Sequence, residues 1–237
     1  MVADPVVLIT GATGEFGPYV AKAFAAAGAR LAPTARKLDQ AEALLADLGL
    51  GADRGLPAVV DVTQAASVNE WVQAVQAKWG RVDVLVNIAG GFKPGKLVAE
   101  MDEADLDFMF NLNARSAFLT CRAVVPLMLE QGGGKIVNVG AKAALQAGRK
   151  QTAYAISKAA VLRLTEALSA EVREQNINVN AVVPSSIDTP ANRANSPTAD
   201  ASKWVAPADL AAVVVFLASD AARAIHGAAI PVYGLVG

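Results

Sequence analysis

Short runs of apolar, often β-branched residues alternate along this chain with longer alanine-rich segments, and this alternation limits the possible folds more than any other feature. The apolar runs cover residues 6–10, 30–34, 58–60, 82–87, 135–139, 177–183 and 229–232. Because they lack polar alternation, they indicate strands that are covered on both faces. The rhythm predicts an α/β fold, a doubly wound, Rossmann-type parallel sheet of about seven strands with helices on both faces. Ligands of such sheets bind at the carboxyl ends of the strands.

A length of 237 residues suits a single domain, because α/β sheets of this size form one unit with one large core. We therefore expect one domain over residues 1–237, with a substrate loop near residues 185–206. The stretch 184–197 is rich in proline, serine and asparagine and is predicted to be a mobile loop after the sixth strand. Pro33 removes a ladder donor from the second predicted strand, which argues against regular pairing there.

Composition and charge exclude several classes of protein. Hydrophobic residues make up 54% of the chain and charged residues 18%, which is typical of a folded core rather than of disorder. A net charge of −1 does not indicate the basic surface that binding to nucleic acid or to an anionic membrane requires. Cys121 and His226 are the only residues of their types, which excludes an internal disulfide and a Cys/His metal site.

Two further observations concern location. The longest apolar stretch near the end, residues 210–218, is about half as long as a bilayer span requires. The start carries Asp4 and then a strand, which does not resemble a signal peptide. A single cysteine also fits a reducing compartment, so we expect a cytoplasmic protein.

The first predicted strand runs into a glycine-rich turn, Thr10-Gly11-Ala12-Thr13-Gly14-Glu15-Phe16-Gly17-Pro18. Glycines allow a tight turn and a close approach of backbone N–H groups to a pyrophosphate, which the following helix N-terminus favours. An ordinary strand-turn-helix is the alternative, but the position after the first strand favours dinucleotide binding. The expected contacts are Gly11, Thr13, Gly14, Glu15, Phe16 and Gly17.

Residues after the next three strands extend this prediction. Ala35 and Arg36 follow the second strand, where NAD sites usually carry an acid and NADP sites an arginine for the 2′-phosphate. NADP(H) is therefore favoured and NAD(H) is possible. Asp61 and Val62 are placed to meet an adenine ring. After the fourth strand, the run Asn87-Ile88-Ala89-Gly90 has small residues that let the backbone approach the cofactor, so the expected contacts include Asn87, Ala89 and Gly90.

Tyr154 and Lys158 lie four residues apart at the front of an alanine-rich segment that is predicted to be helical to about Glu171. Residues at this spacing share one helical face, so the phenol and the ammonium would point into the same pocket. A nearby cation lowers the pKa of a tyrosine, so the pair predicts a group that exchanges protons.

Together these motifs resemble the short-chain dehydrogenase/reductase family over nearly the whole chain. The resemblance implies that Tyr154 is the acid/base and that Lys158 lowers its pKa and binds the nicotinamide ribose. Asn113 would join a proton-relay water to Lys158, with Asn111 as the alternative. In the run Pro184-Ser185-Ser186-Ile187-Asp188-Thr189-Pro190, the resemblance assigns cofactor contacts to Pro184, Ile187 and Thr189, the last two at the nicotinamide carboxamide.

Three positions depart from the family pattern. Glu15 replaces the middle glycine of the turn, and Ile88 stands where asparagine is usual. Ala141 lies thirteen residues before Tyr154, where the family has its catalytic serine. Losing one hydrogen-bond donor to a substrate oxygen costs on the order of 3 kcal/mol, about a hundredfold in rate. Reduction of a plain ketone is therefore in doubt.

Local runs around Ala89-Gly90-Gly91-Phe92, Ala141 and 188–204 resemble the dihydropteridine reductases, which also have alanine in the serine's place. The resemblance favours a quinonoid dihydropterin or a similar conjugated ring as substrate. A conjugated C=N system needs a hydride and a proton but no separate oxyanion donor. The candidate pocket residues are Phe92, Ala141, Leu145, Gln146, Asn192, Arg193 and Trp204.

Two alternatives remain open: a carbonyl reductase or alcohol dehydrogenase, and a catalytically silent nucleotide-binding regulator. We expect a small-molecule substrate, no nucleic-acid or membrane partner and no bound metal. By resemblance, we also expect a homodimer or homotetramer.

Overall fold

The computed structural model describes residues 4–236, and within this range the chain forms one sheet of seven parallel strands. Their spatial order is β3-β2-β1-β4-β5-β6-β7. The strands are β1 (Val6–Thr10), β2 (Arg30–Ala35), β3 (Ala58–Val59), β4 (Val84–Asn87), β5 (Gly134–Val139), β6 (Ile177–Pro184) and β7 (Ala229–Val232). The predicted doubly wound parallel sheet is confirmed.

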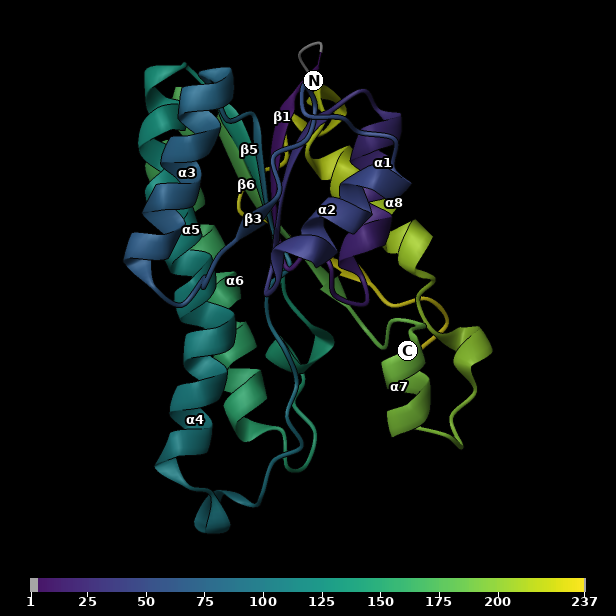
Figure 1. Ribbon diagram of the computed structural model, residues 1–237. Helices are drawn as coiled ribbons and strands as arrows, with labels where there is room; N and C mark the ends of the chain where they lie inside the picture. Colours follow the sequence, from purple (N-terminus) through teal and green to yellow (C-terminus); the bar gives the residue numbers. More distant parts are fainter. Residues whose placement is uncertain (1–3, 237) are drawn as a thin grey trace.

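Helices cover both faces of the sheet (Figure 1). On one face lie α1 (Gly17–Ala26), α2 (Leu38–Asp47) and α8 (Pro207–Leu217), and on the other lie α3 (Ala65–Trp79), α5 (Ser116–Glu130) and α6 (Thr152–Val172). α4 (Glu103–Phe110) and the short α7 (Pro190–Asn195) extend beyond the sheet. Short single turns complete the set: η1 (Val98–Glu100), η2 (Asn111–Arg115), η3 (Lys142–Ala144), η4 (Arg173–Gln175), η5 (Ala201–Lys203) and η6 (Asp220–Ala222). Of the described helices, none is both long and apolar enough to cross a bilayer.

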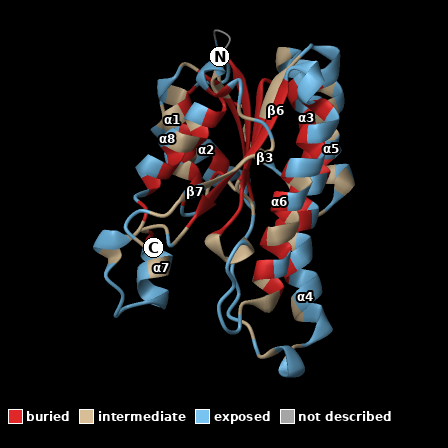
Figure 2. Cartoon of the chain, turned by 180° about the vertical axis from the view of Figure 1, so that it is seen from behind, coloured by how far each residue is buried: buried red, intermediate tan, exposed pale blue. Residues whose placement is uncertain are grey.

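Alternating side chains of the buried strands divide the core into two layers. Val7 of β1 clusters with Phe24 of α1, whereas Leu8, the next residue, clusters with Trp71 of α3. Successive side chains of a strand point to opposite faces, so each continuous apolar run supplies both layers. Figure 2 shows the result, a buried sheet between helices whose outer faces are exposed.

Pro33 lies inside β2 and pairs regularly with β1, whereas on the other side the pairing with β3 begins only at Thr34, so the doubt about regular pairing applies to that side alone. It is in register with Ile9 of β1. The neighbouring Leu31 N–H donates away from β1, to Arg54 O (2.8 Å). Because donor directions alternate along a strand, the missing donor of Pro33 also faces away from β1, toward the short edge strand β3.

Two predicted boundaries also change. β4 begins at Val84 rather than at residue 82, and Val82 N–H donates to the side chain of Gln131 (3.2 Å) instead of to a neighbouring strand. The stretch 184–197 contains α7 instead of being loop throughout. Pro190 begins that helix, and Thr189 Oγ1 accepts from Asn192 N (3.3 Å) as its N-terminal cap.

Candidate active site

A groove of about 930 Å³ runs along the carboxyl edge of the sheet. It is formed by the segments that follow β1 to β6, where the sequence places the ligand. Its lining includes these residues: Gly11, Thr13, Gly14, Glu15, Phe16, Arg36, Asp61, Val62, Ala89, Gly90, Phe92, Ala141, Tyr154, Lys158, Pro184, Ile187 and Asn192. Most of the predicted site residues therefore meet in one place.

The turn after β1 depends on close backbone contacts. Gly11 has φ +65°, and a Cβ there would lie 2.9 Å from the backbone of Ala89. A Cβ at Gly17 would collide with the carbonyl oxygen of Ala12. α1 begins directly after this turn with no side-chain cap, so the positive end of its dipole favours an anion held by the turn.

At the far end of the groove, an arginine and a carboxylate mark the rim. Arg36 is exposed, and among the described residues none bonds to its guanidinium. Asp61 Oδ1 accepts from Thr63 N (2.9 Å) and Thr63 Oγ1 (2.7 Å). These hydrogen bonds hold the pKa of Asp61 below its usual range, so a fixed negative charge lies here.

Tyr154 and Lys158 both face the groove from the first turns of α6, as their spacing predicts. Lys158 is 5% exposed, and its ammonium donates to the carbonyl oxygen of Val139 (2.8 Å). Burial lowers the pKa of Lys158 to about 8 and raises the pKa of Tyr154 to about 12. The predicted lowering of the tyrosine pKa is therefore wrong, because removal of the phenol from water raises the pKa more than the lysine lowers it.

Asn113 joins the loop after β4 to α6. Its Oδ1 accepts from Gly91 N (2.9 Å), and its Nδ2 donates to Gly91 O (3.1 Å) and to Ser157 Oγ (3.0 Å). A Cβ at Gly90 would lie 2.5 Å from Asn113 Oδ1 and 3.3 Å from Lys158 Nζ, so these groups converge on one point. Asn111, the alternative, is exposed. Asn113 lies in the π-helical turn η2, a local irregularity that is frequent at functional sites.

The wall beside Tyr154 is aromatic and aliphatic. Phe92 meets the Tyr154 ring edge to face, with centroids 5.1 Å apart and planes at 81°. Phe92 as a residue is still 49% exposed, whereas Ala141 is 7% exposed and presents a methyl group where a serine would present a hydroxyl. Tyr154 and Lys158 therefore share the groove with a wall residue that lacks this hydrogen-bond donor.

Comparison with known proteins agrees with this geometry. The family model for short chain dehydrogenases matches residues 5–200. The chain belongs to the short-chain dehydrogenase family. D-threitol dehydrogenase of Mycolicibacterium smegmatis is 39% identical, with 97% of this chain and 91% of that protein aligned. The 3-oxoacyl-[acyl-carrier-protein] reductase of Thermotoga maritima is 34% identical, with 97% and 96% aligned. The crystal structure of levodione reductase superposes with a TM-score of 0.92 at 29% identity, covering 99% of this chain and 98% of that one.

Membership makes this chain an oxidoreductase that uses a nicotinamide cofactor, NAD or NADP, on a small-molecule substrate. The groove of this dehydrogenase suits a dinucleotide, since it is lined by the glycine turn that precedes α1 and by the exposed Arg36. When bound, the cofactor supplies or accepts the hydride.

Several predicted contacts of this short-chain dehydrogenase do not line the groove. Asn87 is buried in a polar network instead, where its Nδ2 donates to Asn138 Oδ1 (2.8 Å) and its Oδ1 accepts from Thr120 Oγ1 (2.7 Å). Gly17 and Thr189 act as turn and cap residues behind the surface.

On the substrate side, four predicted pocket residues also lie away from the groove lining. Arg193 pairs with Asp188 (2.5 Å), Leu145 and Gln146 are exposed beyond η3, and Trp204 is half-buried after η5. The substrate wall in this conformation is therefore smaller than predicted.

The sequence reasoning missed two residues that hold the site of this dehydrogenase together. Thr10 Oγ1 accepts from the N–H groups of both Ile88 and Ala89 (3.1 Å each) and so fixes the loop after β4. Ser157 Oγ donates to Tyr154 O (2.8 Å) while it accepts from Asn113. The position of each residue in the sequence could have indicated its role, because Thr10 ends the first strand and Ser157 directly precedes Lys158.

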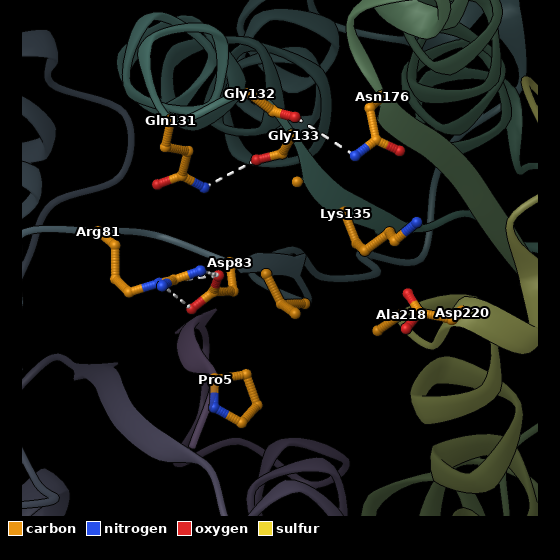
Figure 3. A pocket seen from close by; sticks show the side chains of 12 residues that line it. Pro5, Arg81, Asp83, Gln131, Gly132, Gly133, Lys135, Asn176, Ala218 and Asp220 are labelled. Atoms are coloured by element: carbon orange, nitrogen blue, oxygen red, sulfur yellow. Dashed lines mark hydrogen bonds and ion pairs between the residues drawn. The ribbon is translucent and has the colours of Figure 1, made fainter. Parts of the chain in front are cut away.

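A second cavity, of about 190 Å³, opens at the opposite edge, near the amino ends of β1, β4 and β5 (Figure 3). Arg81 pairs with Asp83 on one side of the cavity, and Lys135 lies on the other side. The Lys135 ammonium donates to Asn178 Oδ1 (2.6 Å). These polar groups already have partners, and none of the proposed catalytic residues lies there.

Proposed function

We propose that this dehydrogenase reduces a small, planar, conjugated substrate with NADPH, and that a quinonoid dihydropterin is the best single candidate. Ala141 carries the proposal, because its buried methyl group leaves the wall beside Tyr154 without the hydroxyl that a ketone oxygen would use. A conjugated C=N system develops its negative charge on ring nitrogen, where one proton donor is sufficient.

The proton comes from Tyr154 in this proposal. The substrate gains a hydride from the reduced nicotinamide and a proton from the phenol. The products are therefore the substrate with two more hydrogens and the oxidised cofactor. Lys158 lies on the same face of α6, and its ammonium stabilises the phenolate that remains. Asn113 holds the loop carrying Gly91 against this helix through Ser157. Water then restores the proton.

The preference for NADPH is supported by Arg36. Its guanidinium lies at the rim beside Ala35 and has no partner among the described residues, so it is available to a 2′-phosphate. Asp61 lies farther along the rim, and its second carboxylate oxygen, which has no partner within residues 4–236, suits an adenine amino group.

The second candidate is oxidation of a secondary alcohol or reduction of a ketone. The relatives favour it, because a D-threitol dehydrogenase is 39% identical over 97% of this chain. The Tyr154–Lys158 pair suffices for such a reaction at a reduced rate, as the missing donor costs on the order of a hundredfold.

We further propose a cytoplasmic homodimer or homotetramer. Exposed apolar side chains on the α4–α6 side support association, since Phe108 is 53%, Phe118 47% and Ile156 46% exposed. Light scattering coupled to size-exclusion chromatography tests it. A monomer at micromolar concentration would contradict it.

One assay panel tests the catalytic proposal. Purified protein is first titrated with NADPH and NADH, and then assayed with a quinonoid dihydropterin, simple ketones and D-threitol. We expect NADPH to bind more tightly than NADH. We also expect kcat/KM for the pterin to be at least about tenfold above that for the best ketone, because the loss of one hydrogen-bond donor to a ketone oxygen lowers the rate by about 10²- to 10³-fold. Turnover of ketones or D-threitol with none of the pterin would reject the first candidate in favour of the second.

A further inference from the structure

The loop after β4 is tied to the segment before α6 by a single close backbone contact. Gly95 N–H donates to Lys150 O at 3.1 Å, and a Cβ at Gly95 would lie 2.5 Å from the same oxygen. Real Cβ atoms do not approach a carbonyl oxygen that closely, so this contact requires glycine. The two segments belong to different βα connections, one after β4 and one after β5.

Lys150, the acceptor, has an unusual backbone. Its φ is +62°, the left-handed region that residues with a Cβ rarely adopt. Such conformations persist where surrounding contacts determine them, and they cluster near functional sites.

This contact lies next to the aromatic pair at the proposed proton donor. Gly95 follows Phe92 by three residues, and Lys150 precedes Tyr154 by four. The centroids of the two rings are 5.1 Å apart, so the two segments touch at two nearby points, the backbone hydrogen bond and the ring contact. The exposed ion pair Lys96–Asp102 (2.6 Å) also holds the loop, but such pairs contribute little.

The cofactor side of the same loop is held independently. Thr10 Oγ1 fixes Ile88 and Ala89, and Asn113 fixes Gly91. Displacing residues 92–97 would therefore leave the backbone that faces the nicotinamide in place.

We propose that Gly95 is a positioning residue for the substrate: its contact with Lys150 holds Phe92 against Tyr154 and so sets the width of the substrate space. The inference rests on the proposed function, in which that space lies beside Tyr154. Substrate binding depends on this contact, whereas cofactor binding does not.

Gly95→Ala tests the proposal, with Val98→Ala as the control in the same loop, where the side chain is 70% exposed. KM is measured for the quinonoid dihydropterin, or for D-threitol if the pterin is not turned over. A displacement of about 1 Å can cost 10²-fold, so we expect Gly95→Ala to raise KM by at least about tenfold. The Kd for NADPH should stay within about twofold, and Val98→Ala should match wild type in both.

Two further measurements complete the test, a second variant and a cleavage comparison, and the cleavage comparison does not depend on turnover. Lys150→Gly keeps the carbonyl acceptor and removes the cost of the left-handed backbone, so its KM should remain that of wild type. Trypsin should cut Gly95→Ala faster than Val98→Ala at Lys93 and Lys96, with NADPH bound to both. Equal KM values or equal cleavage rates for Gly95→Ala and Val98→Ala would overturn the proposal. A rise in the Kd of Gly95→Ala for NADPH as large as the rise in its KM would also overturn it. If wild type turns over no substrate, the proposed function fails while the cleavage comparison still decides the role of Gly95.

Discussion

Replacing Lys158 by methionine should change how stability depends on pH, because the buried ammonium carries a measurable cost. Lys158 is 5% exposed, and burial lowers its pKa from 10.5 to about 8. At 1.36 kcal/mol per unit, this shift of about 2.5 units corresponds to roughly 3 kcal/mol. Lys158→Met removes that cost at pH 7 but leaves the Val139 carbonyl without its donor, which costs about 1–3 kcal/mol. The variant should therefore be as stable as wild type at pH 7, or more stable by up to about 2 kcal/mol.

The sign of the pH dependence follows from proton binding. Between about pH 8 and 10.5 the unfolded chain keeps the lysine proton and the folded chain loses it, so the unfolding free energy of wild type rises with pH. Tyr154 acts in the opposite direction only above about pH 10, because its pKa rises from 10 to about 12 on folding. From pH 8 to 10, wild type should gain roughly 2 kcal/mol relative to Lys158→Met.

Urea unfolding at pH 7, 8, 9 and 10 measures this difference, since titrations common to both proteins cancel. Lys22→Met, at an exposed lysine of α1, is the matched control and should follow wild type at every pH. Parallel curves for wild type and Lys158→Met would show that Lys158 is not a penalised buried cation. The explanation that burial lowers the pKa of Lys158 would then be refuted.

Three other variants test separate parts of the site. Ala141→Ser restores a hydrogen-bond donor beside Tyr154, so kcat/KM for ketones should rise by up to about a hundredfold, while kcat/KM for a dihydropterin should change by less than about threefold. Steady-state kinetics measure both values, and equal gains on the two substrates would contradict this prediction. Arg36→Ala should raise the Kd for NADPH by about 10- to 100-fold, the value of a charged hydrogen bond, and leave NADH unchanged in fluorescence titration. Unchanged NADPH binding would remove Arg36 from the site. Gly17→Ala forces a methyl group against the Ala12 carbonyl, so it should lower the unfolding free energy by about 1–3 kcal/mol and weaken binding of both cofactors; native-like melting and binding would show that the turn tolerates a Cβ.

The sheet could be predicted because buried parallel strands have a simple signature. The seven apolar runs correspond to the seven observed strands within residues 4–236, and the glycine turn lies where a helix N-terminus meets the groove. Tyr154 and Lys158 could be placed together because helical geometry fixes the relation of residues four apart.

What could not be predicted depends on side-chain direction and on desolvation. Asn87 lies in a motif beside the cofactor loop, yet its amide points into a network with Asn138 and Thr120, a direction that spacing does not encode. The pKa of Tyr154 rises because the ring is withdrawn from water, a property of the whole fold. The Gly95–Lys150 contact joins residues 55 positions apart and leaves no periodic trace in the sequence.

The central claim is that Tyr154 donates the proton in a nicotinamide-dependent reaction within this groove. The most direct measurement compares wild type and Tyr154→Phe for NADPH binding and for NADPH oxidation with the best substrate of the panel. The account predicts a Kd within about twofold and a loss of kcat/KM of about 10²- to 10⁴-fold, the usual value of a positioned proton donor. Undiminished NADPH oxidation by Tyr154→Phe would contradict it.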